Sequence, residues 1–331
     1  MKLTTAILCA ALGALSACTS VPQSSARRAP PAPEFWLDLA RGDEVPDHAV
    51  LADLAKAGVI FVGEAHTIAR HHAVQLQLLQ GLSARGVPLV LCLEQLEARD
   101  QPAVDRYFHR EIDFAALAQA IDWPKQWTNY ADYRPLCEFA RQHGIPIRAL
   151  NAPAGIIRAV SRGGGVAQLA PADRAQLPAE IALDDPVYER LTNLELAMHM
   201  SANPARLRPM FEAQVARDET MAANVIAGRR MEAAPDQPRT AFVIVGAGHM
   251  RFGLGTADRV RRRDPGVVER LVIVSGSEQL ILTDAQKGQG HDVTISHADL
   301  RAVGRPAADY VRVLPLSASA GLPPGHPPIP P

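Results

Sequence analysis

Cysteine is scarce in this chain, and so are aromatic residues and any surplus of charge of one sign. The 331 residues include four cysteines, too few for a disulfide-stabilised scaffold. Lysine and arginine number 34 against 35 acidic residues, so no cationic surplus exists to release the counterions of a nucleic acid. Hydrophobic residues make up 47%, which is typical of globular proteins and excludes wholesale disorder. We therefore expect a globular protein without a nucleic-acid partner.

No hydrophobic run is long enough to span a membrane as a helix, which needs about 20 apolar residues. The apolar stretch 6–15 follows Lys2 and ends in small residues, as in an export signal. Leu15-Ser16-Ala17-Cys18 is similar to a bacterial lipobox, in which the cysteine is lipidated and becomes the new N-terminus. The alternative is an ordinary secretory signal with an incidental cysteine.

These features predict an organisation for the whole chain. Residues 1–17 form a lipoprotein signal peptide, Cys18 carries the lipid, and 18–34 form a flexible tether rich in proline and alanine. Thr19, rather than aspartate, after the cysteine is typical of sorting to the outer membrane of a Gram-negative bacterium. The domain spans 35–315, and a proline-rich, disordered tail follows at 316–331.

Short apolar runs alternate with helical patterns along the domain, which is the signature of a parallel sheet. The predicted strands are 58–62, 88–93, 145–150, 241–245 and 271–274. Helices are predicted at 69–85 and 133–143, and a mostly helical section at about 154–230. We therefore expect an α/β fold, with a central, mostly parallel sheet flanked by helices and a helical insertion that forms a lid or second lobe. Cys92 and Cys137 lie in apolar patterns and are expected to pack, although a disulfide between them stays open.

Polar residues follow each predicted strand. They are Gly63-Glu64-Ala65-His66, Glu94, Asn151, Gly246-Ala247-Gly248-His249 and Ser275. Ligands of parallel sheets bind outside the carboxyl ends of the strands, so these side chains are expected to share one site.

Histidines and carboxylates in such a site have two interpretations. Imidazole and carboxylate groups are ligands of zinc, iron and manganese, and Glu64 or Glu94 could act as general base on a metal-bound water. A divalent-metal-dependent hydrolase would then use Glu64, His66, Glu94 and His249. Equally, His66 and His249 could bind carboxylates without a metal. His71 and His72, which begin the next helix, are expected to face solvent.

Taken together, the motifs resemble the ChaN-like haem-binding lipoproteins. The blocks that carry the resemblance are Gly63–His66 with His71, His72 and Gln75; Glu94; Trp127, Tyr133 and Phe139–Arg141; Ala149–Pro153; His199; Gln214, Asp218, Met221 and Ala222; Gly246–His249 with Gly253–Gly255; and Ala307–Tyr310. This family is in turn distantly similar to Tiki proteases and erythromycin esterases, which keeps the hydrolase alternative open.

The resemblance implies a protein that binds ferric, b-type haem for iron acquisition and passes it to uptake machinery at the outer membrane. It also implies a homodimer that encloses haem and a tyrosine that binds the iron. Of the five tyrosines, Tyr107 is the first choice, because it follows Glu94 by about one helix and could overhang the site. The alternative for Tyr107 is a core position. His199, His66 and His249 are the candidate histidines on the haem side, and an exposed helix face is the alternative for His199.

Overall fold

The computed structural model describes residues 34–199, 204–234, 237–275 and 303–314. The predicted signal peptide, Cys18, the tether up to residue 33 and the proline-rich tail lie outside these residues. Within the described ranges, no helix combines the length and the apolar character needed to cross a membrane.

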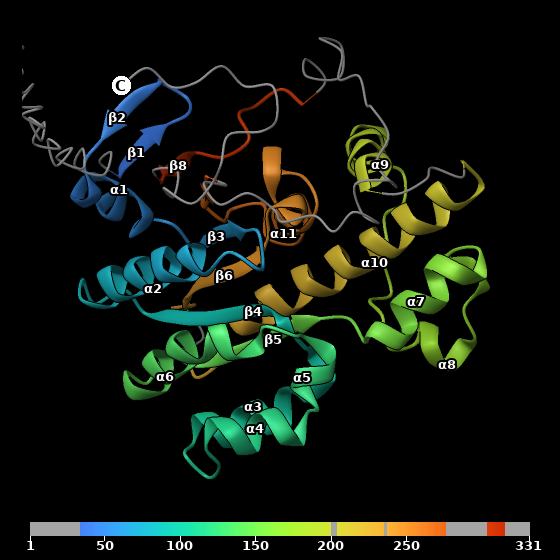
Figure 1. The fold of residues 1–331 in the computed structure, drawn as a ribbon, viewed down its shortest axis with the longest axis horizontal. Coiled ribbons are helices and arrows are strands. Elements are labelled where there is room, and N and C mark those ends of the chain that lie inside the picture. The colour runs from blue at the N-terminus through green and yellow to red at the C-terminus, as the bar shows by residue number, and fades with distance from the viewer. Residues whose placement is uncertain (1–33, 200–203, 235–236, 276–302, 315–331) are drawn as a thin grey trace, which may run out of the picture. The chain divides into compact units, whose positions relative to one another are not determined.

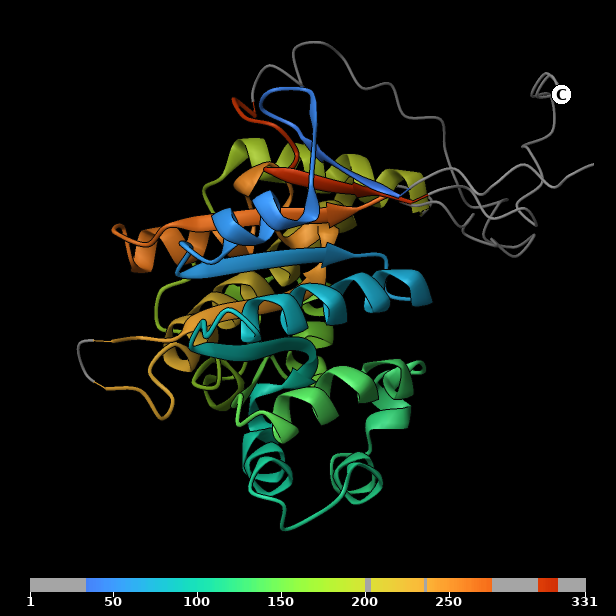
Figure 2. The same cartoon turned by 90° about the vertical axis from the view of Figure 1, so that its left-hand side faces the viewer.

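Eight strands form one sheet, in the order β2-β1-β8-β7-β3-β6-β4-β5. Their bounds are Phe35–Asp38 (β1), Asp43–Val45 (β2), Val59–Glu64 (β3), Leu89–Glu97 (β4), Ile147–Asn151 (β5), Thr240–Gly246 (β6), Glu269–Val274 (β7) and Tyr310–Val313 (β8). In the part of the sheet ordered β8-β7-β3-β6-β4-β5, each strand is parallel to its neighbours. Strand β1 is antiparallel to both β8 and β2. Figure 2 shows red β8 and orange β7 above blue β3 in this sheet. The predicted α/β fold with a mostly parallel sheet is confirmed.

Helices cover both faces of the sheet (Figure 1). Their bounds are Asp47–Leu54 (α1), Ala69–Ser83 (α2), Gln101–Phe108 (α3), Phe114–Ala120 (α4), Trp123–Gln126 (α5), Arg134–Gln142 (α6), Ala154–Gly163 (α7), Pro171–Arg174 (α8), Pro186–His199 (α9), Pro204–Gly228 (α10) and Thr256–Arg263 (α11). Helices α1, α2 and α6 pack on one face, and α10 and α11 pack on the other.

Strand β3 shows why the sheet needs a layer of helices on each face. All six of its residues are buried, and side chains alternate between the two faces of a strand. Ile60 and Val62 belong to the core under α2 and α6, whereas Val59 and Phe61 belong to the core under α10 and α11. A strand covered on both sides reads as a continuous apolar run, which is why the sequence predicts it.

The helical section after β5 packs against the sheet through its longest helix. Helix α10 contacts β5, β4 and β6, and α7 packs on α10. Helix α7 ends at Gly163 and is capped by Gly164, whose positive φ of 96° is the left-handed conformation for which glycine is suited. The section therefore extends from the carboxyl end of β5 over one face of the sheet.

The two cysteines of the described fold do not pair with each other. Cys92 lies on β4 in the core under α10, and Cys137 lies on α6 in the core on the opposite face. Both are free and fully buried, and burial raises the pKa of each thiol to about 12. The structure thus assigns both thiols to packing, which answers the question that the sequence leaves open.

Candidate functional site

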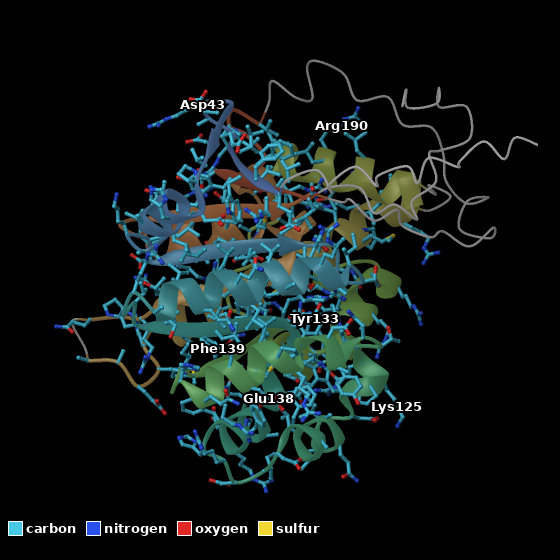
Figure 3. All side chains as sticks on the ribbon, turned by 60° about the vertical axis from the view of Figure 1, so that its left-hand side comes forward. Asp43, Lys125, Tyr133, Glu138, Phe139 and Arg190 are labelled. Atoms are coloured by element: carbon cyan, nitrogen blue, oxygen red, sulfur yellow. The ribbon has the colours of Figure 1, made fainter. Side chains whose placement is uncertain are left out.

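The carboxylate of Glu64, at the carboxyl end of β3, is a buried acceptor surrounded by donors. Its side chain is fully buried. Oε1 accepts hydrogen bonds from His66 Nδ1 (2.8 Å), Gln95 Nε2 (3.0 Å) and the Tyr133 hydroxyl (2.5 Å). Tyr133 immediately precedes α6. Figure 3 labels Tyr133 together with Glu138 and Phe139, which lie on that helix. These donors come from three separate elements, so the carboxylate ties them together at one edge of the sheet.

Helix α2 supplies the donors to the other oxygen of Glu64. Gln75 Nε2 donates to Oε2 (2.6 Å), and His72 Nδ1 lies 3.2 Å from the same oxygen. His72 Nε2 in turn donates to the backbone carbonyl of His66 (3.1 Å). Burial by itself would raise the pKa of Glu64, but the hydrogen bonds from His66 and His72 lower it to about 2. Glu64 is therefore an anion at neutral pH.

The expectation that His71 and His72 face solvent is wrong. Their residues are 2% and 6% exposed. His71 Nδ1 accepts from the backbone N–H of Ala65 (3.0 Å), and its Nε2 donates to the carbonyl of Ser275 (3.2 Å). The physical reason is that the loop after β3 has backbone groups that need partners once they are buried. The first turn of α2 packs under this loop and supplies those partners.

His66 is the member of this network that reaches solvent. Its side chain is 34% exposed, while Nδ1 is held by Glu64. The Trp127 ring stands edge-on to the imidazole at 4.8 Å, and Asn129 Nδ2 donates to the His66 carbonyl (2.6 Å). A Cβ on Gly246 would lie 2.8 Å from His66 Nε2, so glycine at the end of β6 leaves the imidazole its place. Burial lowers the pKa of His66, but the hydrogen bond to Glu64 and the charges of Glu94 and Glu64 together outweigh it, so the net pKa is raised.

A second buried cluster lies around His249. Glu94 Oε2 accepts from the backbone N–H of Gly246 (2.6 Å), and Glu94 Oε1 lies 3.3 Å from His249 Nε2. On the other side of the ring, His249 Nδ1 lies 2.7 Å from Asp218 Oδ1. Burial would lower the pKa of His249, but the charges of Glu94 and Asp218 raise it to about 10. His249 is an imidazolium held between two carboxylates, and its charge in turn keeps the pKa of Glu94 far below the usual value despite burial.

Asp218 connects this cluster to the helical section. Its Oδ1 also accepts from the Thr256 hydroxyl (2.8 Å), and its Oδ2 accepts from the Tyr188 hydroxyl (2.7 Å). Asp218 is on α10, Tyr188 on α9 and Thr256 at the start of α11. The carboxylate therefore fixes three helices around the positive charge of His249.

The structure brings together the four residues that the sequence singles out after strands. Glu64 and His66 form one pair, and Glu94 and His249 form another. The two pairs meet at Gly246, because a Cβ there would contact both His66 Nε2 (2.8 Å) and Glu94 Oε2 (3.6 Å). Of the remaining strand-end residues, the Ser275 carbonyl binds His71, and Asn151 is buried at the end of β5.

Several members of the site are not among the strand-end residues. Gln75, Gln95, Tyr133, Tyr188 and Asp218 all contact the two clusters through side chains. They lie on helices or inside a strand, so no strand-end signal marks them. The spacing of His72 and Gln75, three residues apart on one helix face, is the local signal that could have indicated a shared partner.

Among the residues that the structure describes, no group of three or more histidines, cysteines, aspartates and glutamates is arranged to hold a metal ion. The site instead pairs His66, His72 and His249 with carboxylates. His66, with its Nδ1 held by an anion and its ring partly exposed, can bind a ligand or exchange a proton.

Comparison with known proteins identifies the family. The sequence profile described as haem-binding uptake, Tiki superfamily, ChaN matches residues 50–260. The chain belongs to this family. The matched segment of the chain includes Glu64, His66, Glu94 and His249, so the candidate site lies within the ChaN-type region.

A solved structure supports the ChaN fold. The structure titled cofacial heme binding to ChaN of Campylobacter jejuni matches with a TM-score of 0.61 and 19% identity, over 84% of this chain and 95% of that one. An erythromycin esterase EreC mutant matches with a TM-score of 0.41 and 12% identity, over 72% and 76% of the two chains.

A plant protein is similar in sequence to this ChaN-family chain. The chloroplastic protein RETICULATA-RELATED 5 of Arabidopsis thaliana is 22% identical over 255 residues, which are 70% of this chain. The chain spans about one third of the length of that relative.

In this ChaN-family fold, Tyr107 does not overhang the site. It lies on α3 and is fully buried, its ring packs edge-on to Phe114 at 6.1 Å, and the Arg141 guanidinium lies 4.5 Å over it. Its hydroxyl is buried without a hydrogen-bond partner, and burial raises the pKa of the phenol well above its usual value. The expectation fails because the face of α3 that carries Tyr107 packs into the core, beside Val104. A buried, neutral phenol is a poor candidate for a haem ligand.

The other tyrosines differ in the availability of their hydroxyls. Tyr133 and Tyr188 are buried and donate to carboxylates, and the Tyr310 hydroxyl donates to Asp53 (3.0 Å). Tyr130 is partly exposed, and its hydroxyl has no hydrogen-bond partner in the described part of the chain. His199 is the last residue of α9, and its side chain lies outside the described residues.

These residues fit the donor chemistry of haem. Histidines that bind metals usually donate their other ring nitrogen to a carboxylate or carbonyl, as His66 does to Glu64. Tyr130 lies three residues after Trp127, whose ring contacts His66, and its N–H donates to the Trp127 carbonyl (3.1 Å). The Tyr130 ring itself stacks on Phe114 at 6.2 Å. Imidazole and phenolate are both known axial ligands of haem iron.

Proposed function

We propose that this chain is a haem carrier that binds ferric, b-type haem at the carboxyl edge of its sheet. The observation that carries the proposal is the partly exposed imidazole of His66, the member of a buried, charge-paired network that reaches solvent, in a chain of the ChaN family. The network is built around an anion, Glu64, so it holds the imidazole in one orientation. A preoriented donor binds without first losing its own conformational freedom.

Tyr130 is the tyrosine that we propose as ligand of the haem iron, in place of Tyr107. When bound, ferric haem would supply a hard Lewis acid for which an anionic oxygen is a suitable donor. Because Tyr130 has no competing partner in the described part, binding breaks no protein hydrogen bond of its hydroxyl. A single strong axial bond also suits a carrier that must release its ligand.

The carrier is further proposed to be exported and lipid-anchored. The lipobox at Leu15–Cys18 and the threonine that follows support attachment to the outer membrane of a Gram-negative bacterium. From there it would pass haem to the iron-uptake machinery, as a homodimer that encloses haem. Mass spectrometry of the membrane fraction tests the anchor, because Cys18→Ser should abolish the lipid mass and leave the protein unattached.

A haemin titration tests haem binding and its ligand. Full-length protein in detergent is titrated with haemin, and the Soret band is followed for the wild type and for Tyr130→Phe, Tyr107→Phe and Tyr310→Phe. We expect Tyr130→Phe to shift the Soret band and weaken binding about tenfold or more, with the other two close to wild type. Spectra equal to those of haemin with an unrelated protein would refute haem binding. An unchanged Tyr130→Phe spectrum would refute the ligand alone.

Hydrolysis without a metal is a second candidate function. It is favoured by one observation, the hydrogen bond from His66 Nδ1 to a buried anion, which leaves Nε2 to accept a proton from water. The family match favours haem binding over it. Purified protein that cleaves p-nitrophenyl esters, with loss of activity in His66→Ala and no effect of chelators, would support this second function.

A further inference from the structure

The chain enters the described fold at the carboxyl edge of the sheet, which is the edge that carries His66. Strand β1 is antiparallel to β8, and Phe35 at its start pairs with Val313 at the end of β8. The preceding residue, Glu34, accepts a hydrogen bond from Arg70 (2.8 Å) in the first turn of α2. The segment upstream, with the proposed lipid attachment, is therefore joined to the fold on the side of the candidate site.

The length of this upstream segment limits which side of the domain lies near a membrane. Cys18 is 17 positions before Phe35. A flexible linker of that length has an end-to-end distance of roughly 20–25 Å. Strand β3, with six residues, spans roughly 20 Å between the two edges of the sheet. The carboxyl edge is therefore held close to the bilayer, whereas the amino edge is farther away by the length of a strand.

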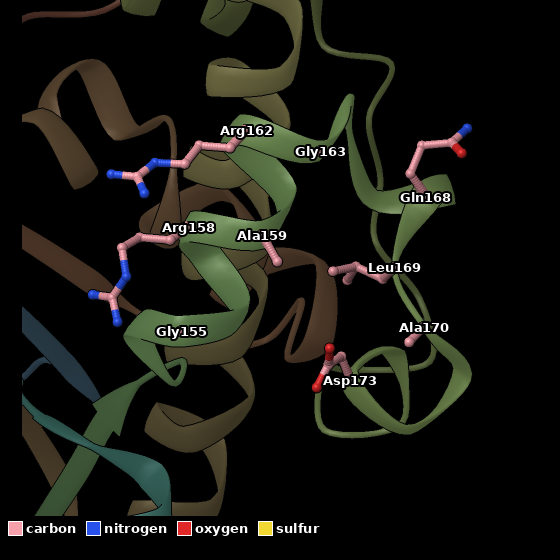
Figure 4. Close-up of a pocket in the computed structure, with 9 residues that line it drawn as sticks. All are labelled: Gly155, Arg158, Ala159, Arg162, Gly163, Gln168, Leu169, Ala170 and Asp173. Carbon is pink, nitrogen blue, oxygen red and sulfur yellow. The ribbon is translucent and has the colours of Figure 1, made fainter.

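Helix α7 carries two exposed arginines on this side of the sheet. It begins three residues after the last residue of β5, and its main packing partner is α10 rather than a strand. The hollow beside α7 in Figure 4 has Leu169 and Asp173 on its far wall. The guanidinium groups of Arg158 and Arg162 extend from the opposite face of the helix, away from that hollow (Figure 4). The outer face of α7 thus presents two positive charges to solvent.

These two arginines have no counter-ions in the fold. In the part of the chain that the structure describes, neither guanidinium has a hydrogen bond or an ion pair. By contrast, Arg208 on α10 binds both Glu189 and Glu212. Because Arg158 and Arg162 are four residues apart on one helix, their like charges are neighbours and repel each other. An anionic bilayer relieves this repulsion and attracts basic residues that lie within a Debye length of its surface.

We propose that the carboxyl edge of the sheet faces the membrane and that Arg158 and Arg162 contact anionic lipid headgroups. The inference rests on the proposed function, because it takes the lipid anchor as given. It deepens that function by naming the partner of this side of the molecule, a negatively charged bilayer surface. Haem bound beside His66 is then released toward the membrane, where an embedded acceptor can receive it.

Fluorescence quenching from the bilayer tests the orientation. Full-length lipidated protein with one fluorophore, at Ala159→Cys or at Ala84→Cys, is inserted into vesicles of phosphatidylethanolamine and phosphatidylglycerol that contain spin-labelled headgroups. Ala159 is exposed on α7, and Ala84 is exposed at the end of α2, near the amino edge of the sheet. Cys92 and Cys137 are fully buried and stay unlabelled in the folded protein. We expect quenching at Ala159→Cys to be about twofold stronger or more than at Ala84→Cys.

Charge reversal tests the contribution of the two arginines. In the Ala159→Cys protein, R158E/R162E is compared with R85E/R230E, a matched control that reverses two exposed arginines near the amino ends of the strands. We expect R158E/R162E to lower quenching to the level of the amino-edge label and the control to leave it unchanged. R158Q/R162Q, which removes both charges without adding any, must lower quenching in the same direction. Replacing phosphatidylglycerol by phosphatidylcholine must do so as well, because no anionic headgroup is left.

The outcomes separate this orientation from the function on which it rests. Quenching at Ala84→Cys that equals or exceeds quenching at Ala159→Cys refutes the orientation, while the haem carrier and its anchor stand. Unchanged quenching in R158E/R162E refutes the contact between the arginines and lipid. If wild-type protein carries no lipid on Cys18, the anchor fails and this inference fails with it. The haemin titration in detergent uses no vesicles, so its result judges the haem carrier alone.

Discussion

The Glu64 carboxylate accepts hydrogen bonds from β4, from α2 and from the turn that precedes α6. A buried charge with this many donors is stabilised only while all of them are in place. The imidazole of His66 is oriented by the same group. The stability of this edge of the sheet and the orientation of His66 therefore depend on one side chain.

Replacing Glu64 by glutamine should be costly even though the shape is kept. The amide would turn a donor toward groups that also donate, and it would leave buried partners without their anion. We expect Glu64→Gln to lower the free energy of unfolding by about 3 kcal/mol in urea denaturation. Glu34→Gln, which removes a partly exposed partner of Arg70, should cost less than about 1 kcal/mol. Equal effects of the two variants would contradict this role of Glu64.

Tyr107 should respond in the opposite way. Its hydroxyl is buried without a partner, so Tyr107→Phe removes a group that only costs desolvation. We expect the free energy of unfolding to stay equal or to rise by up to about 1 kcal/mol, with haemin binding unchanged. Tyr133→Phe, which loses a hydrogen bond to a charged group, serves as the contrasting variant and should lose about 2 kcal/mol. A loss in Tyr107→Phe would mean that its hydroxyl does have a partner.

At the scale of elements, the end of β6 controls the position of His66. In Gly246→Ala the new methyl group would lie 2.8 Å from His66 Nε2, so the imidazole must move. We expect haemin binding to weaken about tenfold and the imidazole resonances of His66 to shift in NMR spectra. Gly266→Ala, where the nearest side-chain atom is 4.0 Å away, is the control and should leave both unchanged. Normal haemin binding by Gly246→Ala would show that the imidazole is not constrained here.

Among the strands, the sequence predicts those with a buried apolar run and misses those without one. Strands β3 to β7 follow from apolar runs, whereas β1 and β8 are short and half-buried, so pairing rather than composition defines them. In the site, His66 and Glu94 were predictable because parallel strands deliver their ends to one edge. Asp218, on α10, precedes His249 by 31 residues in the sequence. The two side chains meet through tertiary packing, which no local sequence pattern encodes.

For the whole molecule, the buried charges predict a limited pH range of maximal stability. Glu64 has a pKa of about 2 in the fold against 4.5 as the ordinary value, so its contribution is lost as pH falls from 4.5 toward 2. His249 has a pKa of about 10 against 6.5, so its contribution is complete below pH 6.5 and is lost as pH rises toward 10. Glu94, whose pKa is also lowered, acts in the same direction as Glu64.

We therefore expect the free energy of unfolding to be highest between about pH 4.5 and 6.5. Urea denaturation at a series of pH values measures it, and the alkaline decline should become shallower in His249→Gln. The control is His109→Gln, an exposed histidine, which should keep the wild-type profile. An alkaline slope that is the same in His249→Gln and wild type would show that another group is responsible.

The pairing of β1 with β8 has a consequence for biosynthesis. Phe35 pairs with Val313, so β1, the first described strand to leave the ribosome, finds this neighbour only when β8, the last described strand, has been made. Until then β1 has only the three-residue β2 beside it, and an isolated two-stranded hairpin is marginal in water. A nascent chain interrupted before residue 310 would keep an open sheet edge at β7, where another polypeptide could add.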